Sequence, residues 1–181
     1  MTPLSIFSKE EIELFESPPR FTAEERKYFF LLPEWAENLI AALPGQVSKI
    51  GFVLQLGYFR ATNKFYPKEL FYPEDSAFVQ RHLGNLEAWH VAHYTGRTMR
   101  RHRTIILMRL GYTAFSPTAA EALSVEAGSA VEKQIRLKDI FSHLLDVLEQ
   151  RRLAVPSYSA LATIITTAFR THLASPLREF S

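Results

Sequence analysis

Apolar residues recur three or four positions apart in successive segments of the chain, and no segment alternates apolar and polar residues as surface strands do. Proline, glycine and helix-capping residues separate these segments. The clearest stripe follows one helical face from Leu161 to Phe169. We therefore expect an all-α fold, with helices over residues 8–17, 22–30, 33–43, 47–60, 73–83, 86–95, 97–110, 116–127, a separate one from near 129, 138–152 and 157–175.

The segment 47–60, VSKIGFVLQLGYFR, is apolar on nearly all sides. Such a segment is typical of a helix that the rest of a domain buries. Gly51 and Gly57 each lower helix propensity by about 1 kcal/mol relative to Ala, so we expect a ring or another backbone to pack closely there. Gln55 is the lone polar residue in the middle and needs a hydrogen-bond partner. The pattern predicts a compact multi-helix domain around this buried central helix.

Length and composition favour a folded globular protein. The chain has 181 residues, of which 47% are apolar and 22% charged. We expect an N-terminal helical subdomain over residues 1–115 and a C-terminal helical hairpin over 116–181 that shares or adjoins its core. The sequence has no Cys, which excludes disulfides and fits a reducing compartment. It has no apolar run of the roughly 20 residues that span a bilayer and no secretory signal, so we expect a cytoplasmic protein without membrane contact.

The positive charge is concentrated late in the sequence. Residues 1–96 hold 9 Lys and Arg against 12 Asp and Glu, whereas residues 97–181 hold 12 against 7. Five arginines lie between 97 and 109, where no acid occurs. Arginine offers a planar fork that matches phosphate or a guanine edge. A solvated basic face is the equally compatible alternative. The candidate DNA contacts on this helix are Arg97, Thr98, Arg100, Arg101, His102 and Thr104, whereas Arg103 lies near the apolar stripe and is expected to be partly buried and paired.

A second candidate contact lies in the segment 137–172. Two amphipathic helices separated by a break near Pro156 resemble a helix-turn-helix, although the connection is longer than the usual tight turn. Hydroxyls and free amides at the start of the second helix suit phosphate. The alternative is an ordinary helical hairpin in which Ser157 only caps. The candidate residues are Ser157, Tyr158, Ser159, Arg152 and Arg170.

Several motifs occur in the order found near the N-terminus of transposases of the Tn-three type, which move replicative bacterial transposons. GFVLQLGYFR at 51–60 resembles the family's GF-x-x-QL-x-Y-x-R pattern, and 77–84 resembles its V-x-x-QLG segment. The segment 98–112 resembles T-R-R-x-H…I…LGF, and 145–170 resembles the paired helices that follow. The resemblance implies a bacterial DNA-binding domain that recognises the terminal inverted repeats of a transposon as double-stranded DNA. In that hypothesis Lys64 reaches an adjacent phosphate.

Catalytic and metal-binding patterns are missing from the sequence. His90 and His93 are three apart, but no further ligand lies at a useful spacing. No phosphate-binding, nucleophile-elbow or zinc-protease motif occurs. We therefore expect no catalytic residue, metal or cofactor. The transposases that the chain resembles cut DNA with an acidic triad in their C-terminal part, so no strand cleavage is expected here. The rival hypothesis is a protein-interaction module that assembles a larger transposase or binds a host factor. Self-association would then take place through the other parts of the full-length transposase.

Overall fold

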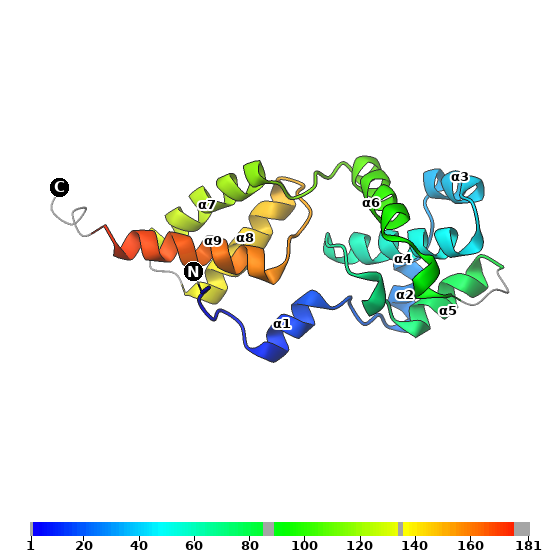
Figure 1. Cartoon of the computed structure of the whole chain (residues 1–181), viewed down its shortest axis with the longest axis horizontal. Helices are drawn as coiled ribbons and strands as arrows, with labels where there is room; N and C mark the ends of the chain where they lie inside the picture. Colours follow the sequence, from blue (N-terminus) through cyan, green and yellow to red (C-terminus); the bar gives the residue numbers. More distant parts are fainter. Residues whose placement is uncertain (1, 85–88, 134–135, 176–181) are drawn as a thin grey trace. The chain divides into compact units, whose positions relative to one another are not determined.

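The computed structural model describes residues 2–84, 89–133 and 136–175, and within these residues the fold is all-α, as expected (Figure 1). Within them there is no strand, only an isolated bridge between Thr113 and Leu153. Among the described helices, none combines the length and the hydrophobicity of a membrane span. The elements are α1 (Lys9–Glu16), α2 (Ala23–Phe29), α3 (Glu34–Ala42), α4 (Gln46–Thr62), η1 (Lys68–Leu70), α5 (Pro73–His82), η2 (Val91–His93), α6 (Gly96–Leu110), α7 (Pro117–Glu132), α8 (Leu137–Gln150) and α9 (Tyr158–Leu173).

The chain divides into two compact units. One, which we call the α4 unit, comprises residues 17–112; the other, the α9 unit, comprises residues 1–16 together with 113–181. The expected N-terminal subdomain included residues 1–16, but these residues pack with the C-terminal helices instead. The reason is aromatic packing: the Phe7 ring centroid lies 4.5 Å from that of Phe141 and 5.4 Å from that of Tyr158.

Capping residues set several helix boundaries at the positions that the sequence predicts. Thr22 and Glu25 form a reciprocal capping box at the start of α2. Ser116 accepts a hydrogen bond from the Ala119 amide at the start of α7. Gly111 ends α6 in the left-handed conformation that glycine adopts most easily, with φ of 72°.

Two expected boundaries were wrong. Gly128 does not end a helix, because α7 continues from Pro117 to Glu132 through it; a single glycine lowers helix stability without breaking the hydrogen-bond ladder. The expected helix over 86–95 is absent from its described part, where η2 is the only helical turn. Residues 85–88 lie outside the described residues. The chain departs from a helix at Tyr94, whose ring turns into the core and whose carbonyl accepts a hydrogen bond from Lys68 Nζ at 2.6 Å.

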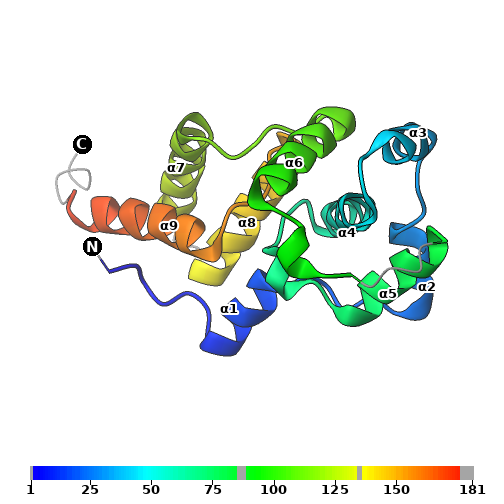
Figure 2. The ribbon, with the colours of Figure 1, turned by 45° about the vertical axis from the view of Figure 1, so that its right-hand side comes forward.

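Helix α4 is the buried centre of the α4 unit, as expected. Figure 2 looks nearly along this helix and shows α6 on one side of it and α5 and α2 on the other. A Cβ on Gly51 would lie 2.5 Å from the Tyr94 ring, and one on Gly57 would lie 2.3 Å from the Phe30 ring. The two glycines therefore admit rings against the helix backbone, which explains why a buried helix tolerates their low propensity.

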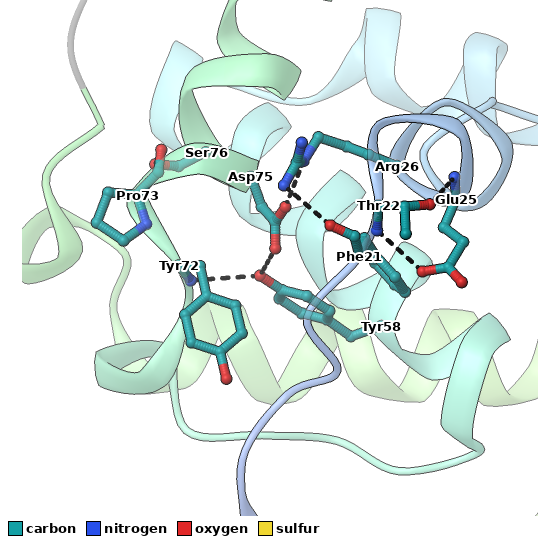
Figure 3. Close-up of polar contacts among 9 residues, drawn as sticks. All are labelled: Phe21, Thr22, Glu25, Arg26, Tyr58, Tyr72, Pro73, Asp75 and Ser76. Carbon is teal, nitrogen blue, oxygen red and sulfur yellow. Dashed lines mark hydrogen bonds and ion pairs between the residues drawn. The ribbon is translucent and has the colours of Figure 1, made fainter.

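A buried acid joins three helices of the α4 unit (Figure 3). Asp75 on α5 is 1% exposed and accepts a hydrogen bond from the Tyr58 hydroxyl of α4 at 2.5 Å. Its other oxygen lies 2.7 Å from Arg26 Nε of α2. A buried carboxylate needs such a partner because desolvation of an unpaired charge is strongly unfavourable. This network fixes α2 and α5 against the central helix.

The core of the α9 unit is almost entirely apolar. Helices α7, α8 and α9 bury an aliphatic cluster centred on Leu123, Leu144 and Leu161. Thr166 is the buried polar residue that the described part of this unit contains, and it accepts a hydrogen bond from the Leu4 amide at 2.7 Å. The N-terminal segment before α1 is thus tied to α9 by backbone and ring contacts.

Candidate nucleic-acid interface

Helix α6 is held on the α4 unit by hydrogen bonds as well as by packing. Arg103 is half-buried, with its Nε donating to Gln55 Oε1 at 2.8 Å and a terminal nitrogen donating to the Tyr66 carbonyl at 2.8 Å. Its guanidinium also lies over the Phe65 ring, 5.2 Å from the centroid. The expectation that Arg103 is paired rather than free is confirmed. Gln55 has the buried partners that its position required, because its Nε2 also donates to the Tyr94 hydroxyl at 2.7 Å.

His102 lies in the buried contact that holds α6 on the α4 unit, and not on the outer surface. It is 0% exposed, and its Nδ1 lies 2.6 Å from the Tyr94 hydroxyl. Burial raises the pKa of the Tyr94 hydroxyl, so this group stays protonated and donates to Nδ1. Burial and, secondarily, the charge of Arg101 lower the pKa of His102 to about 4. At neutral pH His102 is therefore an uncharged, buried residue, and its expected DNA contact stays a prediction.

The opposite side of α6 is exposed and positively charged. We call Arg97, Arg100, Arg101 and Thr104 the cationic face. All four are exposed, and α6 contains no acidic residue. None of the three arginine side chains forms a hydrogen bond or ion pair with another described residue. Arg109 lies elsewhere on the helix, over the Trp35 ring at 5.7 Å from its centroid. Like charges one turn apart repel each other, so an anionic partner would relieve the repulsion.

The first turn of α6 is capped from within the protein. Thr95 accepts a hydrogen bond from the Thr98 amide at 3.3 Å and its hydroxyl donates to the Thr98 hydroxyl at 3.0 Å. Thr98 is half-buried beside this cap. Its role as a DNA contact stays a prediction.

Lys64 does not lie on the surface. The residue is only 6% exposed, in the loop that follows α4. The aromatic residues of that loop hold it against the core, with the Phe65 ring stacked 4.5 Å from Phe59 and with Tyr66 and Phe71 buried. The packing of its neighbours buries Lys64 in this structure, and its expected contact with a phosphate stays a prediction.

The start of α9 is occupied by groups of the protein itself. Ser157 caps the helix by accepting from the Ala160 amide at 3.2 Å. The Tyr158 amide donates to Glu16 Oε1 at 2.5 Å, so a carboxylate already sits where a phosphate was expected. The Tyr158 hydroxyl accepts from the amides of Ile6 and Phe7. Ser159 is exposed, and the expected DNA contacts of Ser157, Tyr158 and Ser159 stay predictions.

Several exposed cations of the α9 unit have acceptors within that unit. Arg170 donates to the Thr2 carbonyl at 2.8 Å, and Arg152 has a left-handed backbone with φ of 51° where the chain turns after α8. The predicted DNA contacts of Arg152 and Arg170 are not tested by these observations. Ion pairs among the described residues of this unit include Lys138 with Glu11 at 2.7 Å, Arg136 with Asp139 at 3.0 Å and Arg151 with Glu126 at 3.0 Å.

A family model described as Domain of unknown function (DUF4158) matches residues 6–168. The chain belongs to the DUF4158 family. The match covers both units, so the family is defined by the two together and not by the helix α6 alone. No curated protein matches the chain.

Charge divides this DUF4158 domain along its structural units. The α4 unit holds 13 Lys and Arg against 8 Asp and Glu, a net charge of +5; the α9 unit holds 8 against 11, a net charge of −3. When the sequence is divided after residue 96, the positive charge falls in residues 97–181, which include α7, α8 and α9 as well as α6. The structure assigns it to the unit that carries α6. The net positive charge therefore lies in the α4 unit and not in the α9 unit.

Sequence reasoning missed two residues that shape this surface. Tyr94 was taken as part of a helix, although it anchors both Gln55 and His102. Met108 was not considered, although it is 70% exposed on α6. Met108 follows Thr104 by four residues and Arg101 by seven, and this helical spacing places it on the cationic face. In the described part of the domain no three His, Asp or Glu side chains are placed to hold a metal ion.

Proposed function

We propose that this DUF4158 domain binds double-stranded DNA at the terminal inverted repeats of a bacterial transposon, through the cationic face of α6. The observation that carries the proposal is a row of three exposed arginines, Arg97, Arg100 and Arg101, whose side chains have no partners among the described residues. Phosphates of DNA supply the missing anions, and release of their counterions drives binding. The resemblance of 51–60, 77–84 and 98–112 to Tn-three-type transposases supplies the repeat as the target.

The anchoring of α6 supports a specific contact over a loose electrostatic one. Arg103 and His102 fix the helix against α4, so the three arginines project from a rigid element. Side chains on rigid elements lose less freedom on binding than those on loops. The domain would act on DNA in the bacterial cytoplasm, as the recognition part of a larger transposase, with strand cleavage residing elsewhere.

A second candidate function is assembly with other protein. Helices α7 and α9 form an open groove of about 780 Å³, lined in part by Ile164, Ala168 and Leu173. The groove is of mixed polarity, since Glu132 and Thr167 also line it, but Leu173 is 66% exposed there, and an exposed apolar side chain in a groove favours a protein contact. Dimerisation that depends on concentration and needs no DNA would favour this function for the α9 unit.

Fluorescence anisotropy with two labelled duplexes tests the DNA proposal. One duplex carries a transposon terminal repeat and the other the same bases in scrambled order, each at two salt concentrations. We expect tighter binding to the repeat, and a preference that persists at the higher salt, because base contacts are less salt-sensitive than phosphate contacts. Equal and salt-sensitive binding to both duplexes would contradict repeat recognition. No binding by folded protein would contradict DNA binding altogether.

A further inference from the structure

An apolar pair interrupts the cationic face of α6. Arg97, Arg101, Thr104 and Met108 follow one another at steps of four, three and four residues, which places them within about 60° of each other around the helix. Ile106 is fully buried on the opposite side. Met108, at 70% exposure, is thus an apolar side chain on the outer side of a helix whose apolar side is already packed.

Thr104 adds a second apolar group beside Met108. Its hydroxyl donates to the carbonyl of Arg100 at 3.2 Å, within the same helix. The hydroxyl hydrogen is therefore used, and the γ-methyl is the group left to contact a partner. Thr104 and Met108 are one turn apart, so their methyl groups form one continuous apolar strip. Arginines lie before this strip, at 97 and 101, and beside it, at 100.

The dimensions of α6 match those of the DNA major groove. A helix with its side chains is about 10–12 Å wide, and the groove is about 12 Å wide. Arg97 and Met108 are about 16 Å apart along the axis at 1.5 Å per residue, which corresponds to about five base-pair steps. Arg100, beside the strip, suits a phosphate that borders the groove, and Arg97 and Arg101 extend the same face towards the start of the helix, where the groove meets the backbone.

We propose that Thr104 and Met108 read thymine in the major groove, where they contact the 5-methyl group. This methyl is the apolar group that base pairs present in that groove, and apolar side chains are its usual partners. Met suits the contact because its flexible thioether adapts to the position of a methyl. The inference rests on the proposed function and adds a base-reading step to the phosphate contacts of Arg97, Arg100 and Arg101.

Replacing thymine by 2′-deoxyuridine tests the contact directly, because only the methyl group is removed. The full domain first selects its preferred duplex from a pool with a randomised segment, and this duplex is then made with each thymine replaced in turn. We expect a loss of affinity of about three- to fivefold at one or two positions. Met108→Ala should bind the thymine and deoxyuridine duplexes equally at one of these positions.

Val125→Ala is the matched control, because Val125 is 74% exposed on α7 in the acidic α9 unit. This variant should keep the full deoxyuridine penalty. Selection of a preferred duplex without any deoxyuridine penalty would overturn the inference and leave the proposed function standing. A full penalty in Met108→Ala, and in a Thr104→Ser variant, would do the same. Failure to prefer any duplex over a scrambled one would overturn both.

Discussion

The exposed arginines of the two units differ in their partners. In the α9 unit, Lys138, Arg136 and Arg151 each lie within 3.0 Å of a carboxylate oxygen, and Arg170 donates to a backbone carbonyl. In the α4 unit, the arginines of the cationic face have no such partner among the described residues. Both units carry several exposed Lys and Arg residues, although only the α4 unit has a net positive charge. The difference lies in which acids the fold brings near.

The cores of the two units also differ in how many buried polar side chains they contain. Among the described residues, five of the six buried polar or charged side chains belong to the α4 unit, namely Gln55, Lys64, Asp75, Ser76 and His102, whereas the α9 unit holds Thr166. Buried hydrogen bonds fix elements at defined positions, because each group must keep its partner. The α4 unit therefore orients α6 by directional contacts, while the α9 unit is held mainly by apolar packing. Three stability measurements test this contrast.

The largest effect is expected from Asp75→Ala. This change leaves Arg26 and the Tyr58 hydroxyl without their buried acceptor, and removal of one partner from a buried pair typically costs about 3–5 kcal/mol. Urea denaturation measures the free energy of unfolding. The control is Asp139→Ala in the α9 unit, whose carboxylate pairs with an exposed arginine and should change stability by less than about 0.5 kcal/mol. Equal destabilisation of the two variants would contradict the contrast.

A pair of glycine substitutions should move stability in opposite directions. Gly51→Ala would force a Cβ to within 2.5 Å of the Tyr94 ring, and we expect destabilisation by about 1–3 kcal/mol from overpacking. Gly128→Ala in α7 meets nothing within 4 Å and should gain about 1 kcal/mol from helix propensity. Thermal melting followed by circular dichroism measures both. A stable Gly51→Ala variant would show that the Tyr94 anchor is loose.

Acid should weaken the fold through His102. The ordinary pKa of 6.5 applies in the unfolded chain, whereas the folded pKa is about 4. The unfolded state therefore binds the proton first, and stability falls as the pH drops from about 6.5 towards 4. Between pH 7 and pH 5 the free energy of unfolding should fall by about 2 kcal/mol.

Urea denaturation at the two pH values measures this difference. His143→Gln is the control, because His143 is exposed on α8, and it should retain the pH-dependent destabilisation. His102→Gln should reduce it. An unchanged pH dependence in His102→Gln would show that another group is responsible for it.

The helical pattern made most of the fold predictable. Segment 47–60 predicted a central helix because its apolar residues leave no polar face, and the capping box at Thr22 predicted the start of α2. Residues 1–16 were misplaced because their contacts to Phe141 and Tyr158 span more than a hundred residues, which periodicity does not report. The exposure of the arginines on α6 was predictable from their helical spacing. The burial of Lys64 and His102 was not predictable, because it depends on which neighbours pack over them.

The salt dependence of DNA binding tests the central claim most directly. Two triple variants are compared with the unchanged domain on the repeat duplex: Arg97, Arg100 and Arg101→Gln on α6, and Arg136, Arg151 and Arg170→Gln in the α9 unit. Both remove three positive charges. We expect the first to weaken binding and to flatten the plot of log K against log salt by about 0.9 for each phosphate that an arginine no longer neutralises, and the second to leave the slope unchanged. Equal slopes in the α6 variant and the unchanged domain, or a larger change in the α9-unit variant, would contradict DNA binding through the cationic face.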